Sequence, residues 1–298
     1  MSKKRIFLSG GNGFVGRNLR DALGGEYDIF APGREELELE NSDSVHEFFA
    51  KNPVDVVLHC ASIGGTRKTK DGGIARRNLK IFYNIVECNE HWKKMITFGS
   101  GAEYSKAHMH AKMKEIEFGE NVPEDEYGRY KYDISRYVEK TDKNIRVLRI
   151  FGCFGKYEDY ELRFISNNIC KAIFGYPITI ANQNVKFDYL YVEDLCIIVR
   201  EFIERDDFKH KHYNVTPSES EELFEIAKKI RDIDGKELDI KVNKEGMGRE
   251  YSGDNSRLRA EMPDLKFTPI EKAIVELYDY YLSNKKDIDE KKICEDRY

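Results

Sequence analysis

The chain of 298 residues contains 49 basic and 54 acidic residues, which give a formal net charge of −5. This balance provides neither the basic field of a nucleic-acid-binding protein nor a strongly acidic tail. No apolar run approaches the length of a membrane span, Met1–Leu8 is too short for a signal peptide, and the six cysteines are scattered without a C-x-x-C pair. We therefore expect a cytoplasmic protein with no nucleic-acid partner, no membrane partner and no metal site.

Short apolar segments alternate with amphipathic segments through the first half of the chain. The apolar segments predict strands at Arg5–Ser9, Tyr27–Ala31, Val54–His59, Lys94–Phe98 and Ile145–Ile150. The segments between them predict helices at Phe14–Leu23, Ser44–Lys51, Gly73–Glu90 and roughly Tyr130–Thr141. Strands separated by helices imply right-handed crossovers and a parallel sheet. The predicted fold class is therefore α/β, a Rossmann-type doubly wound sheet that binds ligands beyond the carboxyl ends of its strands.

The alternation becomes looser after about residue 155. Further helices are predicted at Arg163–Ile173, in a segment ending at Ile203, and at Ser220–Arg231. No repeat, low-complexity tract or flexible linker separates the two halves. We predict a dinucleotide-binding domain over residues 1–155, to which the chain returns around 181–205. Residues 156–298 are expected to form mainly a smaller C-terminal α/β domain that binds substrate.

A glycine-rich loop, Gly10–Gly16 (GGNGFVG), directly follows the first predicted strand. Glycines at this spacing allow a tight turn, close approach of the backbone to a pyrophosphate, and close packing of helix on strand. The helix that starts near Phe14 would offer free N–H groups to the phosphates. We therefore predict that the dinucleotide is bound by Gly10, Gly13, Phe14, Val15 and Gly16.

The end of the second predicted strand bears on the choice between NADP(H) and NAD(H). This segment, Phe30–Arg34 (FAPGR), has no acidic residue at its tip to hold the ribose hydroxyls of NAD. Arg34, together with Arg17, can pair with a 2′-phosphate through charge-assisted hydrogen bonds. The residues therefore favour NADP(H), while Glu35 and Glu36 leave NAD(H) open.

Three polar residues suggest a catalytic group at the carboxyl edge of the sheet. Tyr127 and Lys131 are four residues apart, so a helix places both side chains on one face. A nearby ammonium and a cationic nicotinamide favour the phenolate, which allows Tyr127 to act as an acid or base near neutral pH. Lys131 would also bind the cofactor ribose, and Ser100 at the end of the fourth strand offers a hydroxyl that can polarise a carbonyl. We predict that Ser100, Tyr127 and Lys131 are catalytic and that Ser100 and Tyr127 touch substrate.

The glycine loop and these three residues together resemble the extended short-chain dehydrogenase/reductase family, in its nucleotide-sugar-modifying branch. The resemblance covers nearly the whole chain, because further family segments are similar to Asp55–Ala61, Arg77–Leu79, Leu148–Gly155, Lys186–Asp194, Tyr213–Val215, Asp254–Arg257 and Phe267–Pro269. Gly152 stands where the family often has asparagine, and Lys186 where it often has arginine.

The resemblance also implies contacts that the spacing of residues does not show. It implies that Cys60, Ala61 and Asn78 border the cofactor. It further implies that a nucleotide-sugar substrate is contacted by Asn168, Lys186 and Arg249. A homodimer formed through the helices near residues 73–90 and 130–141 is the family expectation.

Two segments, Leu37–Phe49 and Cys60–Gly65, are most similar to the GDP-L-fucose synthase members of the family. Their epimerising cysteine aligns with Ala102, and their partner histidine falls near Arg163, so that pair is missing here. Family dehydratases follow the catalytic hydroxyl with Asp-Glu, whereas this chain has Gly101-Ala102. What the resemblance implies is therefore hydride chemistry at one carbon: NAD(P)-dependent reduction of a nucleotide-linked 4-keto sugar, with Tyr127 as general acid.

Other functions fit the same residues. A nucleotide-sugar 4-epimerase or C4 dehydrogenase would keep NAD tightly bound, and a reductase could act on another carbonyl metabolite. In a different class, a non-catalytic NAD(P)-binding sensor or regulator would use the fold alone, since fold does not dictate chemistry. Such a sensor has no need of Ser100, Tyr127 and Lys131 together.

Overall fold

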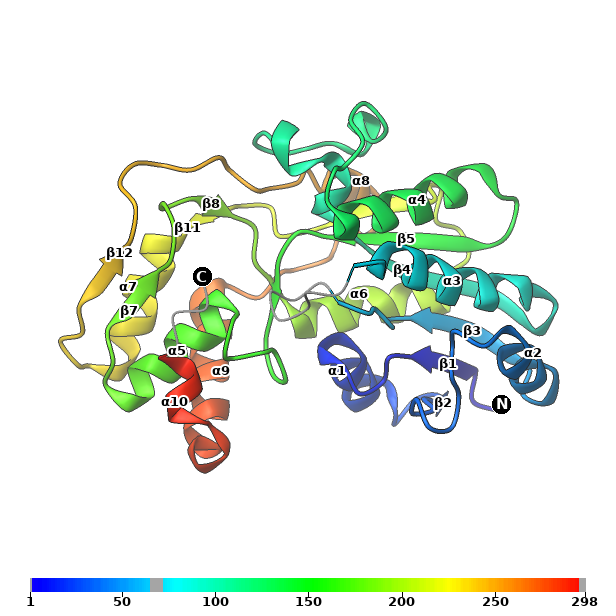
Figure 1. The fold of residues 1–298 in the computed structure, drawn as a ribbon, viewed down its shortest axis with the longest axis horizontal. Helices are drawn as coiled ribbons and strands as arrows, with labels where there is room; N and C mark the ends of the chain where they lie inside the picture. Colours follow the sequence, from blue (N-terminus) through cyan, green and yellow to red (C-terminus); the bar gives the residue numbers. More distant parts are fainter. Residues whose placement is uncertain (1, 65–71, 295–298) are drawn as a thin grey trace.

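A six-stranded parallel sheet runs through the computed structural model, which describes residues 2–64 and 72–294 (Figure 1). Its strand order is β2-β1-β3-β4-β5-β10, and every neighbouring pair is parallel. The strands are β1 (Arg5–Ser9), β2 (Asp28–Phe30), β3 (Val54–His59), β4 (Trp92–Ser100), β5 (Ile145–Ile150) and β10 (His212–Val215). This sheet confirms the predicted fold class. The strand order reverses between β1 and β3, and their carboxyl ends therefore flank the crevice where such sheets bind ligands.

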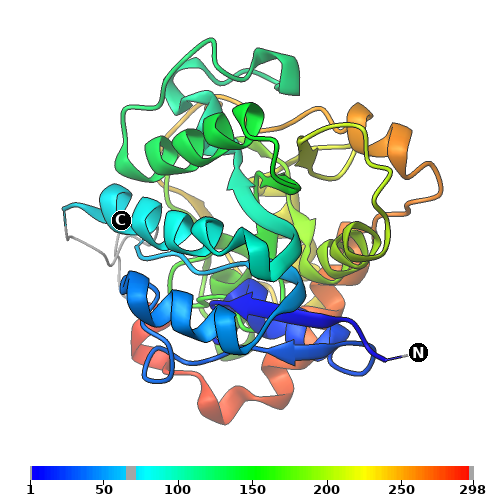
Figure 2. The same ribbon diagram turned by 90° about the vertical axis from the view of Figure 1, so that its right-hand side faces the viewer.

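Helices cover both faces of this sheet because alternate strand residues point to opposite sides. Ile6 and Leu8 of β1 join one apolar cluster, whereas Phe7 joins the other. The first face is covered by α1 (Phe14–Leu23), α6 (Val192–Glu204) and α8 (Ser256–Glu261). The second face, visible in Figure 2, is covered by α2 (Ser42–Lys51), α3 (Ile74–Glu87) and α4 (Glu126–Lys140).

A further apolar cluster comes from the later half of the chain and lies beside the sheet (Figure 1). Its helices are α5 (Phe164–Phe174), α7 (Leu223–Asp234), α9 (Ile270–Ser283) and α10 (Glu290–Ile293). Three small two-stranded sheets accompany them. They pair β7 (Ile178–Ile180) with β12 (Ile240–Val242), β8 (Lys186–Phe187) with β11 (Glu221–Glu222), and β6 (Cys153–Phe154) with β9 (Leu190–Tyr191).

The predicted element boundaries hold best for the buried strands. Those predicted at 5–9, 54–59 and 145–150 have these same bounds in the structure. The fourth helix begins at Glu126 rather than Tyr130, because the Asp125 side chain caps it by accepting a hydrogen bond from the Gly128 N–H (2.9 Å). The helix predicted from residue 220 begins at Leu223, since the two preceding residues pair with β8.

Among the helices of residues 2–64 and 72–294, none has both the length and the apolar character needed to cross a membrane.

Glu158 is a buried carboxyl beside α5, and it makes the stability of the fold depend on pH. Its Oε2 accepts a hydrogen bond from the Ser166 hydroxyl (2.5 Å). Burial raises the pKa of Glu158 from 4.5 to about 8, although Ser166 and Arg163 oppose the shift. The folded protein therefore holds a proton that the unfolded chain releases. The stability contributed by this group is complete below pH 4.5 and is lost as the pH rises through about 8.

We expect Glu158→Gln to remove this pH dependence. Urea unfolding of wild type between about pH 5 and about pH 9 should show a free energy of unfolding that declines relative to the variant. The exposed Glu35 provides a control, because Glu35→Gln should leave the wild-type slope unchanged. A constant difference between wild type and Glu158→Gln across this range would show that Glu158 titrates normally.

Candidate active site

The glycine loop joins β1 to α1 and presses against the segment that follows β3. Gly10 has a φ of +70°, and a Cβ there would lie 2.7 Å from the backbone N of Ala61. A Cβ on Gly16 would lie 2.2 Å from the carbonyl oxygen of Gly10. Neither position has room for a side chain, so the backbone is left bare at the carboxyl ends of β1 and β3. The structure thus brings Gly10, Gly16, Cys60 and Ala61 together, as a dinucleotide site requires.

The amino end of α1 faces this loop. Its N-cap, Gly13, has no side chain to cap the first turn, and the Gly13 N–H donates to the Gly10 carbonyl (3.0 Å). The N–H groups of a first helical turn have no partner inside the helix, and here no side chain of the cap replaces one. Phe14 and Val15 start this turn. The bare loop and the uncapped helix end therefore fit a pyrophosphate.

Asn78 holds the segment after β3 in place. Its Oδ1 accepts from the Ile63 N–H (2.8 Å), and its Nδ2 donates to the carbonyls of Ile63 and Ile74 (both 2.8 Å). Both amide hydrogens of Asn78 are therefore donated to backbone carbonyls. Asn78 therefore lies at the border of the predicted cofactor site, where it fixes the backbone of the loop that follows β3.

Arg34 is exposed beyond β2 and pairs with acidic residues of its own loop. Its Nε donates to Glu38 (2.7 Å), and its Nη2 lies 3.8 Å from Glu40. Hydrogen bonding to Arg34 lowers the pKa of Glu38. Arg17 instead stacks its guanidinium over the Tyr157 ring at 3.9 Å. Arg17 directly follows the glycine loop in sequence and Arg34 follows β2, and the two side chains have separate partners in the structure.

Ser100 ends β4 and is fixed by a reciprocal cap. Its Oγ accepts from the Ala102 N–H (3.2 Å), and the Glu103 carboxylate accepts from the Ser100 N–H (2.8 Å). Ser100 is buried at the carboxyl edge of the sheet. These bonds hold its hydroxyl at the end of the strand.

Tyr127 and Lys131 reach this edge from the first turns of α4. A Cβ on Gly128 would lie 2.8 Å from the Ala102 carbonyl oxygen, so the start of α4 is packed tightly against the turn after Ser100. The Lys131 Nζ donates to the Phe98 carbonyl of β4 (2.5 Å). The packing of α4 on β4 therefore gathers the three predicted catalytic residues.

The charge of Lys131 is favoured by its neighbours. Burial works to lower the pKa of Lys131, but the Tyr130 and Tyr127 phenols and the Glu103 carboxylate outweigh burial and raise it. Lys131 therefore remains an ammonium at neutral pH.

A buried ion pair lies directly behind Ser100. The Arg149 Nε donates to Glu103 Oε2 (2.8 Å), which also accepts from the Ser135 hydroxyl (2.7 Å), and neither charged side chain is exposed to solvent. Arg149 also donates to the Tyr104 hydroxyl (2.8 Å), which donates to Asn214 Oδ1 (2.8 Å). Tyr104 thus packs inside the protein. This network was not predicted from the sequence, where its one sign is a charged residue, Arg149, inside the apolar strand Ile145–Ile150.

Tyr251 was also missed, and its hydroxyl lies at the same place. It lies beside Gly101, the residue directly after Ser100, and burial, with a smaller effect of the nearby Tyr127, raises the pKa of the Tyr251 phenol. Its ring stacks on Phe187 (centroids 4.8 Å apart) and meets Phe151 edge-on (5.5 Å). Nothing in its local sequence marks Tyr251 as part of a site 151 positions after Ser100.

Three glycines make room for these aromatic rings. A Cβ on Gly101 would lie 2.7 Å from the Tyr251 hydroxyl oxygen, and one on Gly253 would lie 2.3 Å from the Phe151 ring. A Cβ on Gly152 would lie 2.5 Å from the Phe187 ring. The departure from the family asparagine at Gly152 thus has a steric reason in this chain.

The three predicted substrate contacts lie in different surroundings. Asn168 is buried, and its amide donates to the carbonyls of Phe164 (3.0 Å) and Thr179 (3.1 Å) and accepts from the Thr179 N–H (2.8 Å). Its two bonds with Thr179 hold β7 to α5, and its other hydrogen bonds the backbone of its own helix. Lys186 on β8 and Arg249 are exposed, and an Arg249 Nη donates to the carbonyl of Ala107. Two cationic groups thus remain accessible to an anionic ligand.

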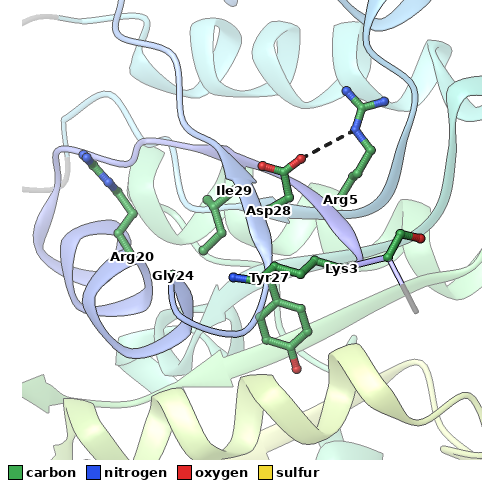
Figure 3. A pocket seen from close by; sticks show the side chains of 8 residues that line it. Lys3, Arg5, Arg20, Gly24, Tyr27, Asp28 and Ile29 are labelled. Atoms are coloured by element: carbon green, nitrogen blue, oxygen red, sulfur yellow. Dashed lines mark ion pairs between the residues drawn. The ribbon is translucent and has the colours of Figure 1, made fainter.

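A groove of about 630 Å³ lies elsewhere, at the amino ends of β1 and β2 (Figure 3). It is lined by Ser2, Lys3, Arg5, Arg20, Gly24, Tyr27, Asp28 and Ile29, and the Arg5 Nε lies 4.0 Å from an Asp28 carboxylate oxygen. Parallel sheets bind ligands at the opposite, carboxyl edge. This groove is therefore separate from the candidate site.

Comparison with known proteins places this geometry in a family. The model of the NAD dependent epimerase/dehydratase family matches residues 6–216, which include the glycine loop, Ser100, Tyr127 and Lys131. The chain belongs to this family.

Individual members of the family resemble the chain to different extents. GDP-L-fucose synthase of Escherichia coli (strain K12) is 34% identical over 113 residues, which are 36% of this chain and 35% of that enzyme. The chain thus matches about a third of the length of that relative. GDP-6-deoxy-D-talose 4-dehydrogenase of Aggregatibacter actinomycetemcomitans is 22% identical over 292 residues, 92% of this chain and 97% of that enzyme.

Among solved structures, the GDP-mannoheptose C4 reductase from Campylobacter jejuni with NADP bound has a TM-score of 0.81 and 17% identity. The match covers 94% of this chain and 99% of the reductase chain. This likeness shows that the two proteins share a fold over nearly their whole lengths.

Proposed function

We propose that the protein is an NAD(P)-dependent oxidoreductase that reduces a nucleotide-linked 4-keto sugar at C4. The observation that carries the proposal is the convergence of Ser100, Tyr127 and Lys131 beside the bare glycine loop. The resemblance to enzymes named for reactions at C4 of GDP-linked sugars supports it. Residues 156–298 would supply most of the nucleotide-sugar contacts, with Lys186 and Arg249 facing the diphosphate.

The proposed reaction assigns one task to each residue. Ser100 holds the carbonyl oxygen of the sugar by donating a hydrogen bond, which stabilises the negative charge that develops there. Tyr127 donates its proton to this oxygen, and the Lys131 ammonium stabilises the phenolate that remains. When bound, the reduced nicotinamide supplies the hydride that C4 receives. One proton and one hydride thus convert the ketone into an alcohol.

The structure around Gly101 argues against dehydration. Family dehydratases place an aspartate at this position, but here the Tyr251 hydroxyl and the Phe151 ring occupy the space that any side chain would need. Ala102, at the position of the epimerising cysteine, is buried and carries no proton donor. These features support hydride chemistry at one carbon without elimination or epimerisation at neighbouring carbons.

We infer that NADP(H) is the preferred cofactor and that Arg34 holds its 2′-phosphate in place of Glu38. Arg34→Ala should raise the Kd of NADPH about tenfold, as expected for loss of a hydrogen bond to a charged group, and leave the Kd of NADH unchanged. Fluorescence titration of the reduced cofactors measures both. Arg200→Ala serves as control, because Arg200, on α6, pairs with Glu26. An equal change for both cofactors would contradict a role for Arg34 at the phosphate.

The proposed function is tested by offering NADPH and a panel of nucleotide-linked sugars to the purified protein. We expect loss of NADPH absorbance with nucleotide-linked 4-keto sugars, and none with free 4-keto sugars or with other carbonyl metabolites. A protein that releases tightly held NAD on denaturation and consumes no NADPH would instead be a recycling 4-epimerase. Absence of dinucleotide binding would contradict an oxidoreductase of any kind.

A further inference from the structure

The Glu103 carboxylate joins three elements at the carboxyl edge of the sheet. Its Oε1 accepts a hydrogen bond from the Ser100 N–H at the end of β4 (2.8 Å). Its Oε2 accepts from the Ser135 hydroxyl of α4 (2.7 Å) and from the Arg149 Nε of β5 (2.8 Å). The residue directly before Ser100 is a glycine, and a Cβ on Gly99 would overlap Glu103 Oε1. The carboxylate therefore fits directly against the end of the strand.

Ser135 lies on the same face of α4 as the two predicted catalytic residues of that helix. It comes four residues after Lys131 and eight after Tyr127, and side chains at these spacings are neighbours along one side of a helix. Ser135 is fully buried, and its hydroxyl donates to Glu103. This bond therefore connects the face that carries Tyr127 and Lys131 to the turn that follows Ser100.

The link between the turn and the helix is held firmly at both of its ends. Near the start of α4, a Cβ on Gly128 would lie 2.8 Å from the Ala102 carbonyl oxygen, so helix and turn are in close contact there as well. The side chains of Glu103 and Arg149 are both 0% exposed, and hydrogen bonds to charged groups are stronger where water does not compete for them. The carboxylate that receives the Ser135 hydroxyl is therefore itself fixed.

We propose that Glu103 is a positioning residue that fixes the Ser100 hydroxyl relative to the Tyr127 phenol, through its hydrogen bonds with the Ser100 N–H and with Ser135. Both hydroxyls must reach the same oxygen of the substrate, and a displacement of about 1 Å in such a group can lower the rate about 100-fold. Glu103 acts through Ser100 and contacts neither substrate nor cofactor. This inference rests on the proposed reduction of a 4-keto sugar.

Ser135→Ala is the first test variant, because it cuts the link to α4 and keeps both buried charges and the cap of Ser100. In the full-length protein with NADPH and a nucleotide-linked 4-keto sugar, its kcat should fall about tenfold. KM and the Kd of NADPH should stay within about twofold of wild type, since Ser135 is buried away from both ligands. Glu103→Gln keeps the shape of the side chain but removes the charge at Oε2, and it should lower kcat by at least as much.

The same two changes made in a Ser100→Ala background distinguish positioning from a general loosening of the fold. Loss of a donor such as Ser100 should by itself lower kcat about 100-fold. Once this hydroxyl is gone its position no longer matters, so we expect Ser135→Ala and Glu103→Gln to cause no further fall in that background. A role confined to stability would lower kcat by the same factor with and without the Ser100 hydroxyl.

Ser166→Ala is the matched control. Ser166 is also fully buried on a helix, and its hydroxyl also donates to a buried carboxylate, that of Glu158 (2.5 Å). Its kcat should stay within about twofold of wild type. Circular dichroism melts without substrate show where each variant is fully folded, and kinetics are compared below the lowest of these temperatures. If Glu103→Gln does not fold, Ser135→Ala with and without Ser100→Ala decides the result.

The outcomes separate this inference from the proposed function. An active wild type together with an unchanged kcat for Ser135→Ala would overturn the inference. An equal fall of kcat with and without the Ser100 hydroxyl, or a rise in KM alone, would overturn it as well. A wild type that reduces no nucleotide-linked 4-keto sugar would instead refute the proposed function, on which the inference rests.

Discussion

Tyr127→Phe is expected to lower kcat by about 10³-fold, because it removes the proton that the sugar oxygen receives, and general acids contribute about 10²- to 10⁴-fold. The phenyl ring can still pack edge-on against Tyr130, as the native ring does (5.6 Å). The Kd of NADPH should therefore stay near the wild-type value. Steady-state kinetics with the 4-keto substrate and cofactor titration measure the two effects.

The control for this variant comes from the same helix. Tyr137→Phe also removes a phenol from α4, but Tyr137 packs against Phe82 and Tyr83, away from Ser100. Its kcat should be unchanged. If Tyr127→Phe retained a kcat within a few-fold of wild type, another group would have to protonate the substrate. The catalytic assignment of Tyr127 would then be wrong.

Glu103→Ala is expected to destabilise the protein by about 3–5 kcal/mol, the usual effect of removing one partner of a buried ion pair. The guanidinium of Arg149 would remain between the Tyr104 and Phe118 rings (4.7 Å from each centroid) without its carboxylate. The Ser100 N–H and the Ser135 hydroxyl would each lose an acceptor. The loss is measured from urea unfolding with circular dichroism.

Two further variants show whether the effect comes from the unpaired charge. Glu26→Ala breaks the exposed pair with Arg200 and should change the free energy of unfolding by less than about 1 kcal/mol. Combining Glu103→Leu with Arg149→Met removes both buried charges and should recover part of the stability. A loss below about 1 kcal/mol for Glu103→Ala would mean that solvent reaches Arg149.

The buried strands could be predicted from the sequence because their signal is local. Val54–His59 is apolar at four of its six positions, and the structure confirms both of its ends. The start of α4 was harder to predict from the sequence, since Glu126 and Tyr127 do not begin an apolar pattern. Its boundary depends on the side chain of Asp125, whose capping bond decides where the helix begins.

The candidate site shows the same division between local and distant contacts. The four-residue spacing singled out the Tyr127–Lys131 pair, and the position of Ser100 at the end of the fourth strand singled out its hydroxyl. The Glu103–Arg149 pair spans 46 positions, and Tyr251 reaches Gly101, directly after Ser100, from a different part of the chain. The periodicity of apolar residues does not indicate which distant segments contact each other, because these contacts depend on how the whole fold packs. Such contacts follow only from the structure.

Transfer of deuterium from reduced cofactor that carries deuterium at both positions of nicotinamide C4 tests the central claim most directly. The purified protein is incubated with this cofactor and a nucleotide-linked 4-keto sugar, and the product is analysed by NMR. The account predicts one deuterium at C4 of the sugar for each cofactor oxidised. A product without deuterium at C4, or one formed with no net oxidation of the cofactor, would contradict it.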